Sequence, residues 1–211
     1  PAPLRQGGAG TQKIFQLLGE MFPSARVLRM DSDVISEEDG AGDEIVRRFR
    51  KREADILVGT RLVSKGFHFP DVTLVGVIDG DTPLNMPDFR AAERTFTLLF
   101  QAGGRAGRGD KAGLVIIQTA QPDHYTMHAL MARDFRAFAL TELEHRRELE
   151  YPPYGHLAHV VFHGANKELV EKTAEDAATR LSALPALQGM EVLGPAPCVY
   201  GRLKGRFRFQ L

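Results

Sequence analysis

The clearest chemical signal in this sequence is a run of nine residues, Gln101–Gly109, that reads QAGGRAGRG. Arg105 and Arg108 lie three positions apart in it, among four glycines. An arginine presents five N–H donors in a rigid planar fork that matches a phosphate group. Neighbouring glycines let backbone amides come close to a ligand. The run therefore predicts a phosphate-binding loop. The alternative is a solvated glycine-rich loop with two incidental arginines.

A second polar loop follows the apolar stretch Ile56–Val58, which is typical of a buried parallel strand. This loop brings the hydroxyl groups of Thr60 and Ser64 and the ammonium group of Lys65. Ligands of open α/β sheets collect beyond the carboxyl ends of the strands. We therefore expect these three side chains to contact phosphate oxygens. The alternative is a plain connection between two strands.

Two other groups imitate metal ligands, and we do not assign them. Asp79 and Asp81 follow an apolar stretch as in a Walker B site, but no loop with Lys-Ser/Thr precedes them. His124 and His128 are four residues apart and could share a metal on one helix face. No third ligand is recognisable nearby, so the sequence predicts no metal in this chain.

The elements that would position these loops alternate between strand and helix. A first helix is predicted from Thr11, its expected N-cap, because apolar residues recur there at helical spacing. Another helix is predicted after an expected cap at Asp88. The expected inward residues of the first helix are Ile14, Leu17, Leu18 and Met21. Strands are predicted over 25–30, 56–58, 73–78 and 114–117, and a further helix over 42–52. Because the connections have crossover length, the strands should form a RecA-like parallel sheet.

The remainder of the chain predicts a connecting helix and a second domain. One helical stripe runs from Met127 to Leu143, and the two prolines of Tyr151–Gly155 end it. We therefore divide the chain into a RecA-like domain over 1–122, a connecting helix over 123–150 and a small α/β C-terminal domain over 151–211. In the last domain we expect strands over 157–162 and 191–193, and a helix capped by Asn166 and carrying Leu169 inward.

A hairpin is predicted over 199–211, turning at Lys204-Gly205. Alternation places Arg206, Arg208 and Gln210 on one face and the aromatic residues on the other. With Arg202 and Lys204 these arginines make the one concentrated basic patch of the sequence. Such a patch suits nucleic acid or an acidic peptide. The alternative is an edge strand protected by charge.

The bulk composition is that of an ordinary globular protein, with 43% apolar residues among 211. The 27 basic and 27 acidic side chains cancel, so any binding of nucleic acid must come from local patches. The one cysteine, Cys198, excludes a disulfide framework within the chain and fits a reducing cytoplasm. No apolar run reaches the length of about 20 residues that a membrane span needs, so no membrane partner is expected.

The pattern Q-x-x-G-R-x-G-R over Gln101–Arg108 resembles motif VI of the superfamily 2 helicases. That resemblance implies that Arg108 is the catalytic arginine finger on the γ-phosphate of ATP. It also implies that Arg105 helps bind the same triphosphate, with Gln101 and Gly104 beside it.

Further stretches resemble the PriA family of bacterial replication-restart helicases. Gly59–Val75 is similar to motif V of this family, and Pro87–Phe96 is similar to the stretch before its motif VI. Three more stretches are similar to its C-terminal domain: Tyr151–Pro153, Gly194–Pro197 and Gly205–Gln210. The resemblance implies part of lobe two of an ATP-dependent 3′-to-5′ DNA helicase that restarts stalled forks and helps load the primosome. Thr60, Ser64 and Lys65 would then contact DNA.

The same resemblance implies that cofactor binding involves parts of the protein upstream of this chain. ATP and Mg²⁺ would be held together with a first lobe, and a zinc module would lie upstream of the stretch Gly7–Thr11. The chain is then expected to be a C-terminal fragment that is inactive by itself. Its implied partners are forked and single-stranded DNA, other primosome proteins, and the tail of single-stranded DNA-binding protein at Arg206 and Gln210.

Small departures from the family pattern leave the ATPase efficiency open. They are Phe67-His68 before Phe69-Pro70, the pair Ala102-Gly103 in motif VI, and Cys198 where a small residue is usual. One alternative is therefore a non-catalytic scaffold that binds DNA and partners. Another is a stand-alone nucleotide-binding domain of unrelated function.

Overall fold

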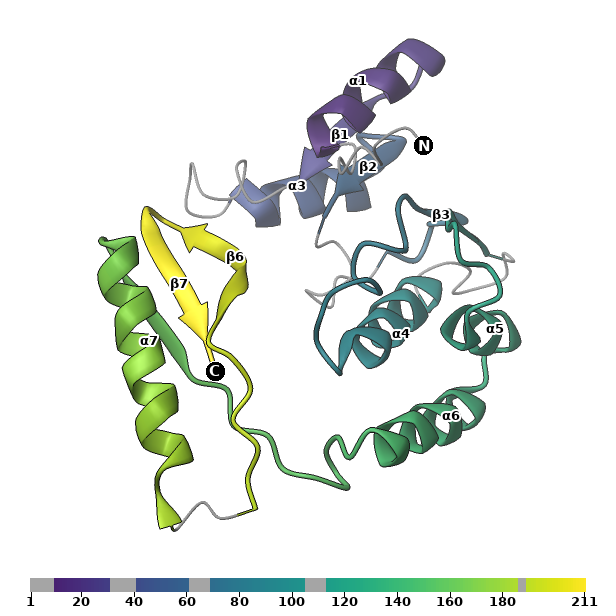
Figure 1. Cartoon of the computed structure of the whole chain (residues 1–211). Helices are drawn as coiled ribbons and strands as arrows, with labels where there is room; N and C mark the ends of the chain where they lie inside the picture. The colour runs from purple at the N-terminus through teal and green to yellow at the C-terminus, as the bar shows by residue number, and fades with distance from the viewer. Residues whose placement is uncertain (1–9, 31–40, 61–68, 105–112, 186–188) are drawn as a thin grey trace, which may run out of the picture. The chain divides into compact units, whose positions relative to one another are not determined.

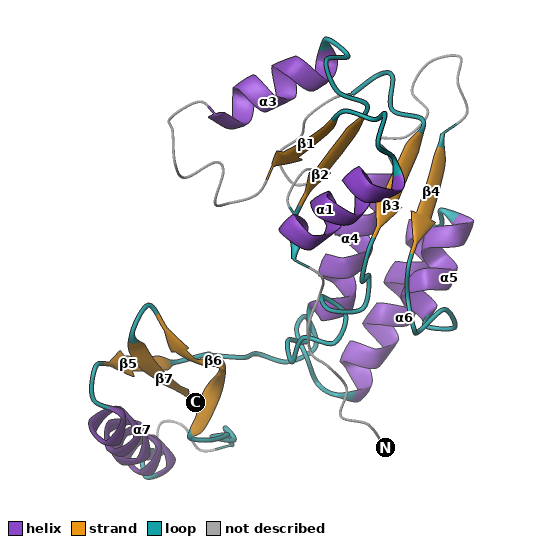
Figure 2. Ribbon diagram, turned by 90° about the horizontal axis from the view of Figure 1, so that it is seen from above, coloured by secondary structure: helices purple, strands orange, loops and turns teal. Residues whose placement is uncertain are grey.

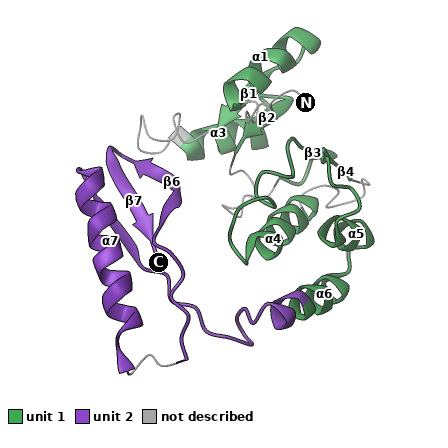
Figure 3. Cartoon of the chain, viewed as in Figure 1, with its two compact units in different colours: residues 1–144 green, residues 145–211 purple. Residues whose placement is uncertain are grey.

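The computed structural model describes residues 10–30, 41–60, 69–104, 113–185 and 189–211 (Figure 1). The chain divides into two compact units, residues 1–144 and 145–211 (Figure 3). The first unit contains parallel strands and helices, and the second contains a small antiparallel sheet with one helix. The predicted α/β class is confirmed for both parts.

The first parallel pair joins β1 (Val27–Met30) to β2 (Ile56–Gly59), with Val27 opposite Ile56. Helices α1 (Thr11–Met21) and α3 (Ala41–Arg50) pack against these strands. The pair is parallel because the chain crosses over between its strands, and α3 forms part of that crossover. The core of this region consists of the buried residues Met30, Ile45, Val46 and Phe69. Four partly buried side chains pack against them: Leu28, Phe49, Leu57 and Val72.

The second parallel pair joins β3 (Leu74–Val77) to β4 (Leu114–Ile117), and α4 (Ala91–Gly103) packs on it (Figure 2). α5 (Tyr125–Ala132) packs against α4, and α6 (Phe135–Glu148) follows it along the chain. One face of the pair is exposed, with Leu74 at 57% and Ile116 at 55%. Within the described residues, β2 and β3 are not hydrogen-bonded to each other. Crossover length is compatible with several strand orders, so the sequence could not predict that break.

The second unit is a three-stranded antiparallel sheet in the order β5-β7-β6 with one helix. Its elements are β5 (Val161–Gly164), α7 (Lys167–Ser182), β6 (Ala196–Leu203) and β7 (Arg206–Gln210). The predicted hairpin is confirmed: Lys204 and Gly205 form its turn with φ of 49° and 78°, the positive pair that a type I′ turn requires. The predicted cap is also confirmed, because Asn166 Oδ1 accepts the Leu169 N–H at 2.8 Å.

Two predicted helix caps are wrong. Gly10, not Thr11, is the N-cap of α1, and Thr11 already lies in the helix. Arg90 is the N-cap of α4, while Asp88 lies two residues earlier and its carboxylate accepts the Arg90 N–H at 3.0 Å. Caps are easily misplaced from sequence because Thr and Asp also favour the positions beside a cap.

The predicted stripe over 127–143 is two helices rather than one. Arg133 has a φ of 53° and ends α5 in a left-handed cap, and α6 then begins at Phe135. Phe135 and Met131 of that stripe are exposed, and so are Leu17, Met21 and Leu169, which were expected to point inward. A left-handed arginine carries no sequence signal, because the conformation usually belongs to glycine or asparagine.

The predicted strands of the second unit are also shifted. β5 begins at Val161, although Val160 still exchanges backbone hydrogen bonds with Leu211. Residues 191–193 are described and form no strand, and the chain becomes extended into β6 only at Ala196. None of the helices in the described ranges combines the length and hydropathy that crossing a lipid bilayer requires.

Candidate functional site

Helix α4 carries the first half of the predicted phosphate-binding run. It buries Phe96, Leu99 and Ala102, three residues apart, toward the unit's interior. The Thr95 hydroxyl is also buried and donates to the Ala91 carbonyl at 2.7 Å. A buried stripe of this kind holds the last turn of α4 in place.

The end of α4 presents Gln101 and Gly104 to solvent. The helix ends at Gly103, and the Gly104 N–H donates to the Phe100 carbonyl at 3.0 Å. A Cβ atom added to Gly103 would lie 4.0 Å from Val115 Cγ2, so the end of α4 lies close to β4. Arg105 and Arg108 lie outside the described residues, and their roles stay predictions.

An aromatic cluster packs α4 against α5 and α6. Phe96 stacks on Phe138 of α6, with ring centroids 4.2 Å apart and planes 14° apart. Tyr125 of α5 stacks on Phe138 at 5.9 Å, and its hydroxyl donates to the buried Glu142 carboxylate at 2.5 Å. Since α4, α5 and α6 share this cluster, α4 is packed through Phe96 against two other helices.

The predicted DNA-contacting loop is anchored at both of its ends. Thr60 follows β2 directly and is exposed, while Ser64 and Lys65 lie outside the described residues. Phe69 returns to the core and meets the Phe49 ring edge to face, with centroids 5.1 Å apart. The loop's two ends are therefore held by β2 and by the packing on α3.

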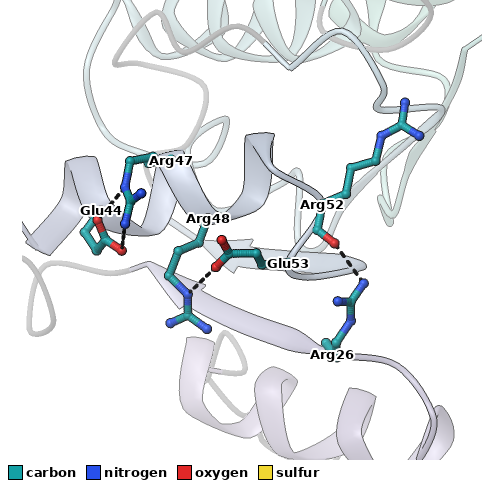
Figure 4. Close-up of polar contacts among 6 residues, drawn as sticks. All are labelled: Arg26, Glu44, Arg47, Arg48, Arg52 and Glu53. Atoms are coloured by element: carbon teal, nitrogen blue, oxygen red, sulfur yellow. Dashed lines mark hydrogen bonds and ion pairs between the residues drawn. The ribbon is translucent and has the colours of Figure 1, made fainter.

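Ion pairs and hydrogen bonds tie the segment after α3 to its surroundings. Figure 4 shows the ion pair between Arg48 and Glu53 and the hydrogen bond from Arg26 to the Arg52 carbonyl. Arg26 binds both carboxylate oxygens of Asp55, at 2.9 and 3.0 Å, and also donates to the Arg52 carbonyl at 2.9 Å. The side-chain hydrogen bond from Arg26 lowers the pKa of Asp55 from 3.8 to about 2. Arg52 in turn pairs with Asp71 at 2.5 Å, just beyond Phe69. Pairs this exposed contribute little energy individually, but they set the geometry at the loop's base.

The two aspartates after β3, Asp79 and Asp81, both accept hydrogen bonds from other groups of the protein. Asp79 accepts the Thr82 hydroxyl at 2.6 Å and the Thr82 N–H at 3.1 Å, and the hydroxyl's bond is the main cause that lowers its pKa. Asp81 accepts the Thr119 hydroxyl at 2.5 Å and the Ala120 N–H at 2.6 Å, which joins the ends of β3 and β4. These donors give both carboxylates a structural role. Among the described residues, no group of three or more potential ligands could hold a metal ion.

The hairpin of the second unit separates its residues as predicted. Phe209 is buried with Val170 and Ala174 of α7, so the aromatic face of β7 packs inward. Arg206, Arg208 and Gln210 lie on the opposite face. Arg202 is not part of that group: its guanidinium lies over the Phe207 ring at 5.1 Å.

Two histidines on this open face were missed at the level of sequence. His163 Nδ1 lies 3.2 Å from Arg206 Nη1, and His159 Nε2 lies 3.1 Å from Gln210 Oε1. Alternation along residues 159–163 does place both rings on one face. Only the pairing of β5 with β7 reveals which face that is.

The predicted site residues thus fall into three groups. Gln101 and Gly104 lie together at the end of α4, Thr60 lies at the end of β2, and Arg206 and Gln210 lie on one face of β7. The remaining site residues, Ser64, Lys65, Arg105 and Arg108, lie outside the described residues.

Two families of known proteins match this chain. Residues 10–110 match the helicase conserved C-terminal domain, and residues 147–211 match the primosomal protein N C-terminal domain. The first match identifies the first unit as part of a RecA-like helicase lobe two, which confirms the predicted fold class.

Named relatives extend over nearly the whole chain. The replication restart protein PriA of Bacillus subtilis is 45% identical over 209 residues, which are 98% of this chain and 26% of that protein. The protein of the same name from Synechocystis is 42% identical over 204 residues, 97% of this chain and 24% of that protein. The one from Treponema pallidum is 40% identical over 210 residues, 98% of this chain and 31% of that protein.

The chain therefore spans between about a quarter and a third of the length of these relatives. Their similarity and the two family matches agree with the motifs and the fold. The chain belongs to the PriA family of replication restart proteins, of which it carries a helicase conserved C-terminal domain followed by the primosomal protein N C-terminal domain.

Proposed function

We propose that the full-length protein carrying this chain is an ATP-dependent DNA helicase. It moves 3′ to 5′, restarts stalled replication forks and helps load the primosome in the cytoplasm. The helicase match over residues 10–110 supports this proposal, because it spans every residue predicted to meet ATP or DNA. The observation that carries it is the anchored end of α4, which presents Gln101 and Gly104 directly before the two arginines.

In this proposal Arg108 stabilises the negative charge that develops on the γ-phosphate during hydrolysis. Arg105 contributes mainly to nucleotide affinity, with Gln101 and Gly104 beside it. A finger acts only when its position is fixed, because electrostatic stabilisation depends on preorganised donors. The buried stripe of α4 and its stack on Phe138 supply that rigidity up to Gly103.

The Mg²⁺ ion that accompanies ATP does not fit the acids described here. Asp79 and Asp81 already accept hydrogen bonds from Thr82, Thr119 and the backbone. We therefore assign ATP and Mg²⁺ binding to a first lobe upstream, which this chain completes with its arginines. It follows that the chain by itself should not hydrolyse ATP.

DNA contacts are assigned to the loop that begins at Thr60. Thr60, Ser64 and Lys65 would contact the phosphates of the tracked strand, so their contribution should not depend on base sequence. The anchored ends of that loop, at β2 and Phe69, support this assignment.

The open face of β7 is proposed to bind the acidic C-terminal tail of single-stranded DNA-binding protein. Arg206 would grip the terminal carboxylate as a fork, and Gln210 would bond the peptide backbone. Both residues lie on the face that α7 leaves uncovered, which supports the proposal. Forked DNA and other primosome proteins are the remaining proposed partners.

The deciding experiment measures DNA-stimulated ATP hydrolysis by the full-length protein. Arg108→Ala should lower the rate by a factor on the order of 10³ to 10⁵. Arg108→Lys should not restore it, because an ammonium group cannot form the planar fork. Arg94→Ala is the matched control: Arg94 also lies on α4, but it is exposed and pairs with Asp88, so activity should stay within about twofold.

Two results would reject this assignment in different ways. If Arg108→Ala kept activity within about twofold of the wild type, Arg108 would not be the finger. If the wild-type protein bound forked DNA without any DNA-stimulated ATP turnover, the protein would be the non-catalytic scaffold.

A further inference from the structure

The open face of the second unit's sheet is a defined polar surface. Strand pairing places His163 opposite Arg208 and Val161 opposite Gln210, so these side chains share one face. The other face, with Phe162 and Phe209, packs against Val170 and Ala174 of α7. Figure 2 shows α7 lying along one side only of the strands β5, β6 and β7.

Each residue proposed to bind the acidic tail has an imidazole beside it on this face. Arg206 Nη1 lies 3.2 Å from His163 Nδ1, and Gln210 Oε1 lies 3.1 Å from His159 Nε2. Both histidines are exposed, so a ligand can reach either ring.

The two imidazoles differ in what protonation does to their contacts. A guanidinium can only donate, so His163 Nδ1 must accept from Arg206, and its ring must be neutral with the proton on Nε2. A protonated His163 has no acceptor, and it would place a second cation against Arg206. His159 instead donates from Nε2 to an amide oxygen, a bond that its protonated form makes equally well. Protonation therefore breaks the contact of His163 and leaves that of His159 intact.

We propose that His163 is the second cationic group of this binding face. The terminal carboxylate of an acidic peptide is held between the Arg206 guanidinium and a protonated His163, and it replaces the bond between those two side chains. Binding therefore shifts His163 toward its protonated form and is accompanied by a net uptake of protons at that ring. This inference rests on the proposed binding of the acidic tail at Arg206 and Gln210, and it names a further residue of that site and its dependence on pH.

The surroundings of His163 favour an anion from outside. Among the described residues of this unit, the charged groups that face His163 are Arg206 and Arg208, both on β7, and the titratable His159 lies on the same face. The residues of β6 paired with β7 on this face are Ala196 and Leu203, which carry no charge. Within the described part of the chain neither arginine forms an ion pair with a carboxylate. The ligand's carboxylate therefore meets cationic groups without a competing acid in these contacts.

The sign of the pH dependence follows from this geometry. An opposite charge within hydrogen-bond reach favours the charged form of an imidazole. By linkage, a ligand that favours the protonated ring binds more tightly as the pH falls, and one pKa unit of such coupling corresponds to about tenfold in affinity. If His163 only positioned Arg206 through its neutral form, acid would remove that support and weaken binding. The two roles thus predict opposite slopes.

The test is calorimetric titration of the 211-residue chain with an acidic peptide that ends in a free carboxylate. Titrations at about pH 8 and about pH 6, the range in which imidazoles change charge, should show roughly five- to tenfold tighter binding at the lower pH. Two buffers with different ionisation enthalpies should report a net uptake of protons, roughly half a proton at its maximum for one pKa unit of coupling. An otherwise identical peptide with an amidated C-terminus should lose most of the affinity at both pH values.

Three variants separate the possible outcomes. His163→Asn keeps an acceptor for Arg206 but cannot be protonated, so its affinity should change less than about twofold between the two pH values. His159→Asn is the matched control on the same face, and it should keep the pH slope of the wild type. Arg206→Ala should lose binding throughout. Circular dichroism checks that each variant is folded.

The failures of the two proposals can be told apart. Unchanged affinity in Arg206→Ala would reject the tail site itself. Loss of binding in Arg206→Ala together with an unaltered pH slope in His163→Asn would reject only the role of His163. A slope that disappears in His159→Asn instead would transfer the role to the other ring, and weaker binding of the wild type in acid would show that His163 acts only by positioning Arg206.

Discussion

Replacing Phe96 by alanine tests whether the end of α4 depends on the aromatic cluster beneath it. The Phe96 side chain is 1% exposed and is among the most deeply buried in the described chain. Its ring stacks on Phe138 at 4.2 Å and on Phe100 at 5.4 Å. Phe96→Ala removes both stacks and leaves a cavity between α4 and α6.

The expected loss follows from these contacts. Burial of a phenylalanine side chain contributes roughly 1.5–3 kcal/mol, and a stacked aromatic pair adds about 0.5–1.5 kcal/mol. With the cavity term, Phe→Ala in a core costs about 3–5 kcal/mol. Phe135 provides a matched control: its ring also faces Phe96, at 6.0 Å, yet it is 63% exposed. Phe135→Ala should therefore cost roughly 1 kcal/mol or less.

Hydrogen exchange measured by mass spectrometry suits this prediction, because the two units can open independently. In Phe96→Ala, the free energy of opening measured for peptides of α4 should fall by about 3–5 kcal/mol. If the total stability of the first unit is smaller than this, the protection of α4 should be lost altogether. Peptides from α7 should be unchanged and serve as an internal reference. In the full-length protein the same variant should lose ATPase activity through the displaced end of α4. Equal losses for Phe96→Ala and Phe135→Ala would refute the reasoning, and so would normal protection of α4 in the Phe96 variant.

Two further predictions concern the first unit. The hydrogen bond from Arg26 lowers the pKa of Asp55 to about 2, below its ordinary 3.8; the pair therefore stabilises the fold above about pH 4, and this contribution disappears as the pH falls from about 4 to about 2. Arg26→Ala should flatten that part of the acid-unfolding curve followed by circular dichroism, and an unaltered curve would show that the pair does not contribute. Lys65→Ala should reduce the salt dependence of single-stranded DNA binding by roughly 0.7 in logarithmic slope, as measured by fluorescence anisotropy in the full-length protein. Unchanged slope and affinity would assign Lys65 to the solvated surface.

Several elements could be predicted from the sequence because their signals are local. The strand Leu114–Ile117 is a short apolar run between polar residues, and its predicted bounds agree with β4. The turn at Lys204-Gly205 and the cap at Asn166 depend on a few neighbouring residues, and both are confirmed. The motif resemblance likewise used short runs, and the matches to the PriA family confirm it.

Other predictions failed where backbone geometry or burial was decisive. The left-handed Arg133 divides one apolar periodicity into two helices, although nothing in the residue type announces it. Leu74 and Ile116 belong to apolar parallel strands yet lie exposed, because α4 covers only one face of that strand pair in the described chain. A pattern shows that a residue is apolar, but only tertiary packing decides whether a neighbour covers it.

The sequence by itself determined the family, the strands and helices of the central elements, and the residue types available for phosphate binding, because these depend on short stretches of chain. Tertiary structure alone decided which groups meet. It gave Asp79 and Asp81 their hydroxyl partners. It also stacked Phe138 of α6 on Phe96 of α4, although α5 lies between these helices in the sequence. It also placed His163 beside Arg206, 43 residues apart in sequence, through the pairing of β5 with β7. Such contacts depend on which strands pair and which helices pack when they are distant in sequence, and a local pattern does not determine that.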